Sequence, residues 1–177
     1  GRGRGGGGSR PASESDMSER GNERYEAHVR RTTHGVAHVK AADWGSLGYG
    51  QGYSCAQDHL PTIADQIVKV RSERSRFHGA GPDGAHLATD VGYLAMGVRD
   101  RAPLLRDAQP PHIREMVEGY RAGYNTWLAE AAGTDALPAW CRDAEWIRPL
   151  DDLDLWTYYV DVGLRASGRN LAEVIGR

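Results

Sequence analysis

The sequence predicts an α+β fold that is mostly helical and carries one short β-hairpin. The chain has 177 residues, of which 40% are hydrophobic, and this suits one domain with a core of its own. Apolar residues recur at helical spacing through most of the chain after residue 60. They alternate with polar residues between residues 25 and 39, which is typical of strands.

Composition and charge exclude several classes of protein. The formal net charge is −2 and the pI is about 6.4, which argues against a general binder of nucleic acid or of a membrane surface. No apolar run is long enough to span a bilayer. Two cysteines are too few for a disulfide-dense scaffold or a four-cysteine zinc site.

The first 22 residues differ in composition from the rest. Residues 1–22 are rich in Gly, Ser, Arg, Pro and Glu and have no periodic apolar residues, so we expect a flexible tail or processed N-terminus there. Residues 23–177 then form the folded unit. The chain begins with Gly1 and has no apolar signal segment, so we expect that any secretory signal has been removed and that the protein is periplasmic or secreted.

A β-hairpin is expected at the start of the folded unit. Tyr25, Ala27 and Val29 alternate with polar residues, and residues 36–39 form a second short apolar run. Gly35 between them can adopt the positive φ of a tight turn. Because an isolated hairpin is only marginally stable, we expect it to join a larger sheet.

A glycine-rich segment follows the hairpin. Asp43 can cap a helix that begins at Trp44. Four glycines in the next eight residues would each cost about 1 kcal/mol relative to Ala inside a helix, unless another backbone approaches closely there. The alternative is a glycine-rich loop. The glycines are Gly45, Gly48, Gly50 and Gly52.

Further helices are expected along the rest of the chain. One contains Leu60 and Val70 and ends at Gly79; residues 79–92 are then a loop, and residues 91–105 hold a helical segment broken at Pro103. The clearest helix spans residues 111–132, where Gly119 and Gly123 allow close backbone contact. An irregular connection follows over residues 134–149. Asp151 or Asp152 then caps a last helix, which covers residues 151–165.

The residues alone do not provide a complete catalytic apparatus. No serine lies in a nucleophile elbow, and neither cysteine has a catalytic motif beside it. His34 and His38 lie in the predicted hairpin, so their spacing does not place them together on a helix face, and we predict no metal site. Cys55 and Cys141 can form a disulfide or remain two buried thiols; export would favour the disulfide.

Four segments resemble the penicillin acylase family, in the branch that contains acyl-homoserine-lactone and aculeacin acylases. The resemblance covers residues 25–175 in order and departs from the family pattern at Ala37, where Pro is usual, and at His34, where Tyr is usual. The segments are residues 34–58 (HGVAHVKA, then DW, LGYGQGY and AQD), 72–79 (SERSRFHG), 118–125 (EGYRAGYN) and 146–153 (WIRPLDDL).

The resemblance implies the small subunit of an αββα N-terminal-nucleophile hydrolase. In that family one precursor cuts itself, and the nucleophile is the new N-terminal Ser of the large β chain, so we expect no catalytic residue in this chain. The hairpin would then join a sheet that the β chain completes. The resemblance places part of the acyl pocket on the last helix, at Val160, Leu164 and Arg165. Some relatives bind calcium, for which Glu173 is the nearby candidate, but we predict no cofactor.

The expected reaction is therefore hydrolysis of a small acyl amide. The expected substrates are N-acyl-homoserine lactones, with penicillin-type β-lactams as a further possibility. Two alternatives stay open: a lipopeptide deacylase of the aculeacin type, and a helical interaction domain without catalytic activity. Neither a nucleic acid nor a membrane is expected as a partner.

Overall fold

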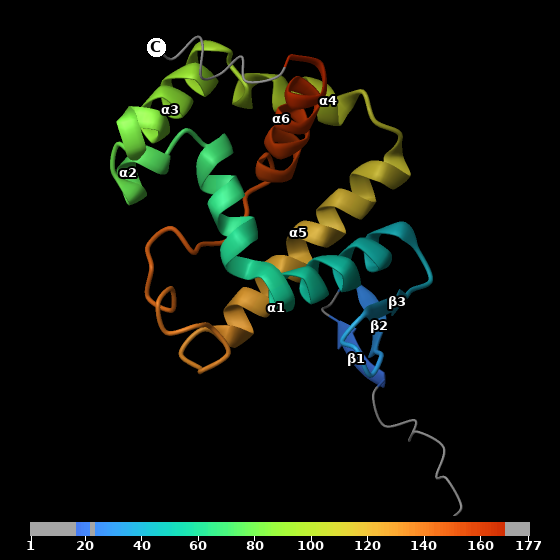
Figure 1. The fold of residues 1–177 in the computed structure, drawn as a ribbon. Helices are drawn as coiled ribbons and strands as arrows, with labels where there is room; N and C mark the ends of the chain where they lie inside the picture. The colour runs from blue at the N-terminus through green and yellow to red at the C-terminus, as the bar shows by residue number, and fades with distance from the viewer. Residues whose placement is uncertain (1–16, 22–23, 169–177) are drawn as a thin grey trace, which may run out of the picture.

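A computed structural model describes residues 17–21 and 24–168 of the chain. A small antiparallel sheet lies beside the first half of α1, and the remaining helices lie on the other side of that helix (Figure 1). The long helices α1 and α5 cross, and α6 lies beside the C-terminal half of α1. The fold is therefore mostly helical with a small sheet, as expected from the sequence.

The predicted hairpin is confirmed. Val29 pairs with Val39 across its two strands, and Gly35 in the turn has a φ of +80°. Residues 17–21, which fall within the segment expected to be a flexible tail, add a third strand on the other side; residues 1–16, 22 and 23 lie outside the described residues. The strands are β1 (Met17–Gly21), β2 (Glu26–Arg31) and β3 (Ala37–Lys40), in the order β1-β2-β3.

Helix α1 (Trp44–Val70) begins where the sequence predicts. The Asp43 carboxylate accepts a hydrogen bond from the backbone N–H of Ser46 at 2.7 Å, as in a typical N-cap. The glycine-rich segment is helical and not a loop. Gly48 and Gly52 lie against the backbone of α5 (Pro111–Ala131), so the compensation expected for their low helix propensity is present. Gly45 and Gly50 instead leave room for side chains of the sheet and the segment before it.

The second half of α1 departs from the prediction. The helix bends at His59, two residues before Pro61, and Figure 1 shows its two halves running in different directions. It ends at Val70 and does not continue to Gly79. Ser72 has a φ of +60°, which interrupts the helix before the short α2 (Arg74–His78).

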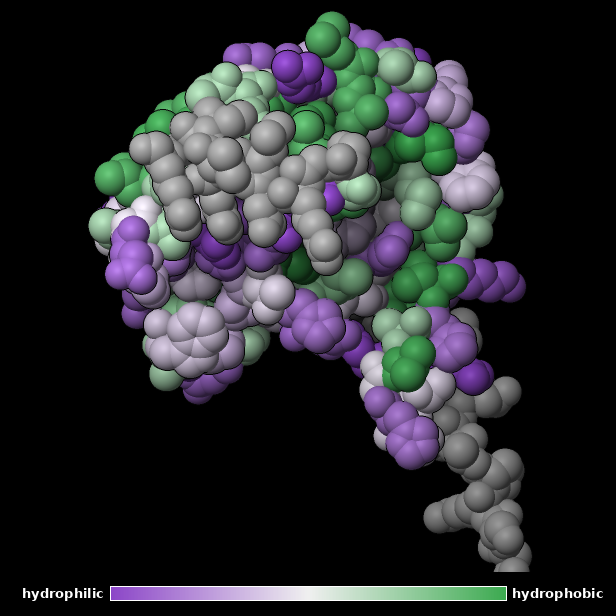
Figure 2. Space-filling view, turned by 45° about the horizontal axis from the view of Figure 1, so that its top comes forward, coloured by the Kyte–Doolittle hydropathy of each residue, from purple (hydrophilic) through white to green (hydrophobic). Residues whose placement is uncertain are grey.

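The prediction of a loop over residues 79–92 is wrong, because α3 (Ala85–Ala95) occupies much of it. Its Leu87, Val91 and Leu94 are exposed, so its apolar spacing does not mark a face buried within this chain. Figure 2 brings α3 and α4 forward and shows apolar atoms exposed on this face. Pro103 lies in the first turn of α4 (Ala102–Asp107), where it is tolerated and does not break a helix.

The helix at residues 111–132 and the last helix are confirmed. Gly133, with a φ of +73°, follows α5 (Pro111–Ala131). The irregular connection is held by Asn125, whose side-chain amide bonds both the N–H and the C=O of Leu150 at 2.8 and 3.0 Å. Asp151 accepts a hydrogen bond from the N–H of Leu153 ahead of α6 (Asp154–Gly168), and this supports the predicted cap.

The predicted disulfide between Cys55 and Cys141 is wrong, since both are free cysteines. Cys55 on α1 lies next to Tyr120 on α5. Cys141 lies beyond the end of α5, where its Sγ bonds the C=O of Pro138 at 3.4 Å.

Candidate functional site

Helix α6 carries the three residues for which the sequence predicts contact with an acyl group. Val160 and Leu164 lie one turn apart, are half-buried and pack against the main hydrophobic core. The Arg165 side chain is 61% exposed and its Nε bonds Asp161 at 3.2 Å. The structure thus places all three on the predicted helix, but other α6 residues line the cavities described here.

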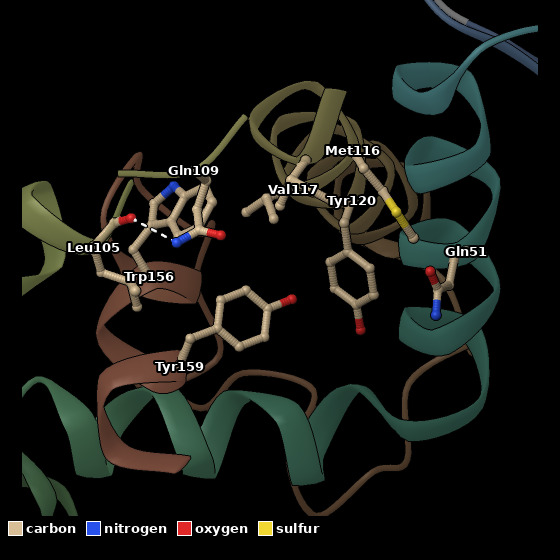
Figure 3. Close-up of a pocket in the computed structure, with 9 residues that line it drawn as sticks. Gln51, Leu105, Gln109, Met116, Val117, Tyr120, Trp156 and Tyr159 are labelled. Carbon is tan, nitrogen blue, oxygen red and sulfur yellow. Dashed lines mark hydrogen bonds between the residues drawn. The ribbon is translucent and has the colours of Figure 1, made fainter. Parts of the chain in front are cut away.

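An uncharged cavity of about 320 Å³ lies between α5 and α6 (Figure 3). The rings of Tyr120 and Tyr159 enter it from these two helices, and Gln51 of α1 lies at its side. The Gln109 side chain donates a hydrogen bond to the C=O of Leu105 at 3.1 Å. The cavity is lined by Gln51, Leu105, Gln109, Ile113, Met116, Val117, Tyr120, Trp156 and Tyr159.

A second cavity, of about 240 Å³, shares two residues with the first. Tyr120 and Tyr159 line both, so these two rings stand between the hollows. No charged side chain lines either cavity, and both present more apolar than polar surface. The other residues of the second cavity are Thr62, Ile63, Gln66, Ile67, Leu155 and Tyr158.

Both shared tyrosines have raised pKa values. Burial and the neighbouring Cys55 thiol raise the pKa of Tyr120 far above its usual value. Burial, with Tyr158 nearby, also raises the pKa of Tyr159. An apolar hollow with a few neutral hydroxyl and amide groups suits an aliphatic or aromatic group better than an ion.

The opposite side of α6 is held by a buried ion pair. Lys69 Nζ lies 2.7 Å from Asp161 Oδ2, and both side chains are at most 3% exposed. The hydroxyl of Tyr93 donates a hydrogen bond to the other carboxylate oxygen. Burial alone would raise the pKa of Asp161, but the hydrogen bonds from Lys69 and Tyr93 outweigh it and keep the pKa below its usual value.

A second acidic anchor lies two turns earlier on α6. The Asp154 side chain is fully buried and pairs with Arg71 and, at 3.1 Å, with Arg99. It also accepts the N–H of Asp151 at 2.7 Å, which completes a reciprocal cap. A cap from Asp151 or Asp152 was predicted from the sequence, but the ion pairs were missed. The spacing of seven residues between Asp154 and Asp161, on a helix with many apolar and aromatic residues, is the signal that could have revealed them.

The described residues hold no group of three His, Cys, Asp or Glu side chains placed to bind a metal ion. Within the same part of the chain, no helix is both long and apolar enough to cross a membrane. The candidate site among the described residues consists of the two uncharged cavities beside α5 and α6, with buried ion pairs on the opposite side of α6.

Comparisons with known proteins agree on one family. Residues 26–168 match the penicillin amidase family. The chain is 38% identical over 158 residues to aculeacin-A acylase of Actinoplanes utahensis, covering 85% of this chain and 20% of the relative. It is 41% identical over 145 residues to the acyl-homoserine lactone acylase PvdQ of Pseudomonas syringae pv. syringae (strain B728a), covering 78% and 18%. The chain thus spans about a fifth of these curated relatives.

A solved structure shares the fold. Thermostable penicillin G acylase from Alcaligenes faecalis aligns with a TM-score of 0.70 and 24% sequence identity. The alignment covers 85% of this chain and 74% of the chain in that structure.

Proposed function

This chain belongs to the penicillin amidase family, and we propose that it is the small subunit of a heterodimeric acylase that hydrolyses the amide bond of N-acyl compounds. The proposed substrates are N-acyl-homoserine lactones, with penicillin-type β-lactams as a further possibility. A lipopeptide of the aculeacin type is the second candidate, which the 38% identity to aculeacin-A acylase favours.

One observation carries the proposal of a separate small chain. The stretch of sequence that spans about a fifth of the curated acylases spans 74% of one chain of the solved penicillin G acylase. A short chain that matches most of another short chain supports a small subunit, with the remainder of the enzyme in a large chain. The small sheet of this chain would then join a sheet completed by that partner.

In the proposed reaction the large chain supplies the nucleophile. Its N-terminal Ser hydroxyl attacks the amide carbonyl carbon while the α-amine of the same residue takes up the proton. The C–N bond breaks, the proton passes to the leaving amine, and an acyl ester on Ser remains. Water then hydrolyses this ester to a carboxylic acid and restores the Ser hydroxyl. This chain contributes to binding and not to these bond changes.

The proposed contribution of this chain is part of the acyl-binding surface. We assign it to α6, through Val160, Leu164 and Arg165. The uncharged cavities beside α6 support a role for this helix, because an acyl chain is apolar and gains free energy on leaving water; their α6 lining residues are Leu155, Trp156, Tyr158 and Tyr159 and not these three. We also propose that the protein is exported, as the sequence suggests.

The test is intact-mass measurement and N-terminal sequencing of every chain in the purified native protein, followed by assay with acyl-homoserine lactones, penicillins and a lipopeptide. We expect a second, larger chain that begins with Ser, and release of a free acid from at least one substrate. Replacing that Ser by Ala should abolish release. A folded, monomeric chain without partner or activity would refute the proposal and favour a non-catalytic interaction domain.

A further inference from the structure

We propose that Asp161 and Lys69 are positioning residues that fix the rotation of α6 and thereby the acyl-length preference of the enzyme. The inference rests on the proposed function, because it assigns to α6 a role in acyl binding. Neither residue lines a described cavity, so their effect would reach the substrate through the helix that they hold.

The geometry supplies two anchors on one face of α6. Asp154 and Asp161 are seven residues apart, so they lie on the same side of the helix and about 10 Å apart along its axis. Their cationic partners are two residues apart at the C-terminal end of α1: Arg71 pairs with the first and Lys69 with the second. Two such contacts from α6 to the C-terminal end of α1 define both the rotation of α6 about its axis and its position along that axis.

Apolar packing alone specifies this rotation poorly. Side chains that can pack against a core occur around most of α6, and a rotation of 100° would exchange one apolar residue for the next. A buried carboxylate tolerates no such exchange, because it would lose Lys69 and Tyr93 and remain charged in an apolar site. The apolar and aromatic residues concerned are Leu155, Trp156, Tyr158, Tyr159, Val160, Val162 and Leu164.

The rotation determines which side chains face the binding surface. With Asp161 turned toward α1, Tyr159 reaches between the two cavities, and Figure 3 shows its ring directed into the first of them. Val162 is 45% exposed in this orientation, whereas Val160 and Leu164 are half-buried. A small rotation of α6 would move the Tyr159 ring and change the space that an acyl chain can occupy.

A substitution of the whole pair separates positioning from stability. The double variant Lys69→Met/Asp161→Leu replaces the ion pair by apolar residues of similar size, a change that often leaves stability unchanged or raised. It removes the directional contact while keeping the core filled. Asp161→Asn and Tyr93→Phe each weaken the same contact by a smaller chemical change. Asp58→Asn is the matched control, because Asp58 pairs with Arg31 at the surface of α1 and lines neither cavity.

The experiment measures kcat and KM of the intact two-chain enzyme for substrates that differ only in acyl length, with the active enzyme counted by titration. We expect the double variant to change the ratio of kcat/KM between long and short acyl chains by roughly 10-fold, mainly through KM. Asp161→Asn and Tyr93→Phe should shift the ratio in the same direction by less. Asp58→Asn should leave it as in the wild type.

Two results would overturn the inference. The first is a double variant that is folded and active and keeps the wild-type ratio. The second is a loss of kcat/KM by one factor at every acyl length, which indicates a merely structural role. In both cases the wild-type enzyme still hydrolyses acyl amides, so the proposed function stands. A wild-type enzyme that hydrolyses none of the series refutes both.

Discussion

Replacing Gly52 by Ala should force the crossing helices α1 and α5 apart. A Cβ added at Gly52 would lie 2.0 Å from the carbonyl oxygen of Tyr120, and one added at Gly123 would lie 2.0 Å from that of Tyr49. Real Cβ atoms essentially never come closer than 3.0 Å to such an atom, so the helices must separate by about 1 Å. The atoms in the way are backbone, which cannot move aside as a flexible side chain can.

The expected magnitude is a balance of two effects. Ala in place of Gly gains about 1 kcal/mol of helix propensity, whereas overpacking a close contact costs about 1–3 kcal/mol. Because the clash involves backbone, we take the upper part of that range and expect Gly52→Ala to destabilise by about 1–2 kcal/mol net. The double variant Gly52→Ala/Gly123→Ala should cost less than the sum of its single variants, because one separation of the helices relieves both clashes.

The assay is urea unfolding of the intact protein followed by near-ultraviolet circular dichroism, with the midpoint and slope compared between variants. Ala129→Gly, on the exposed face of α5, calibrates the propensity effect without a steric one and should destabilise by about 1 kcal/mol. Equal or greater stability of Gly52→Ala would refute the close backbone contact. Full additivity in the double variant would refute the shared separation.

Three further predictions concern stability and the cysteines. Asp43→Ala should lower the free energy of unfolding by about 1 kcal/mol in the same urea assay, through loss of the α1 cap. Hydrogen bonds from Ser46 lower the pKa of Asp43, and Asp161 also has a lowered pKa, so their contribution is complete above about pH 4 and lost as the pH falls through their folded-state values. Acid titration by circular dichroism should accordingly show a shallower loss in Asp161→Asn than in the wild type. A reducing agent should leave the melting temperature unchanged, because Cys55 and Cys141 are free, and a fall in that temperature would contradict the structure.

Local patterns predicted those elements whose contacts are close in sequence. The alternation at Ala27 and Val29 gave the hairpin, and Asp43 gave the start of α1. Gly119 and Gly123, four residues apart, indicated a close backbone contact, and the structure places that contact against α1. In each case the pattern covers a few residues and reflects one physical requirement, such as a cap or a missing side chain.

The prediction failed where a segment packs weakly within this chain. Leu87, Val91 and Leu94 have helical spacing, which the loop prediction over residues 79–92 overlooked, and in α3 all three are exposed. Helix α1 stops at Val70 because Ser72 adopts a positive φ, which nothing in the residues before Gly79 signals. The disulfide was predicted from the compartment and not from geometry, and both thiols are free in the structure.

The sequence by itself determined the family, the main helices and the hairpin, because motifs and periodicity are properties of neighbouring residues. Only the tertiary structure decided which polar residues are buried. Asp161 meets Lys69 of α1 across 92 residues of chain and Tyr93 of α3, in addition to Arg165 on its own helix. Tyr120 of α5 and Tyr159 of α6 line the same two cavities because the folded chain brings these two helices together. Burial depends on which distant segments pack together, and no local pattern records that.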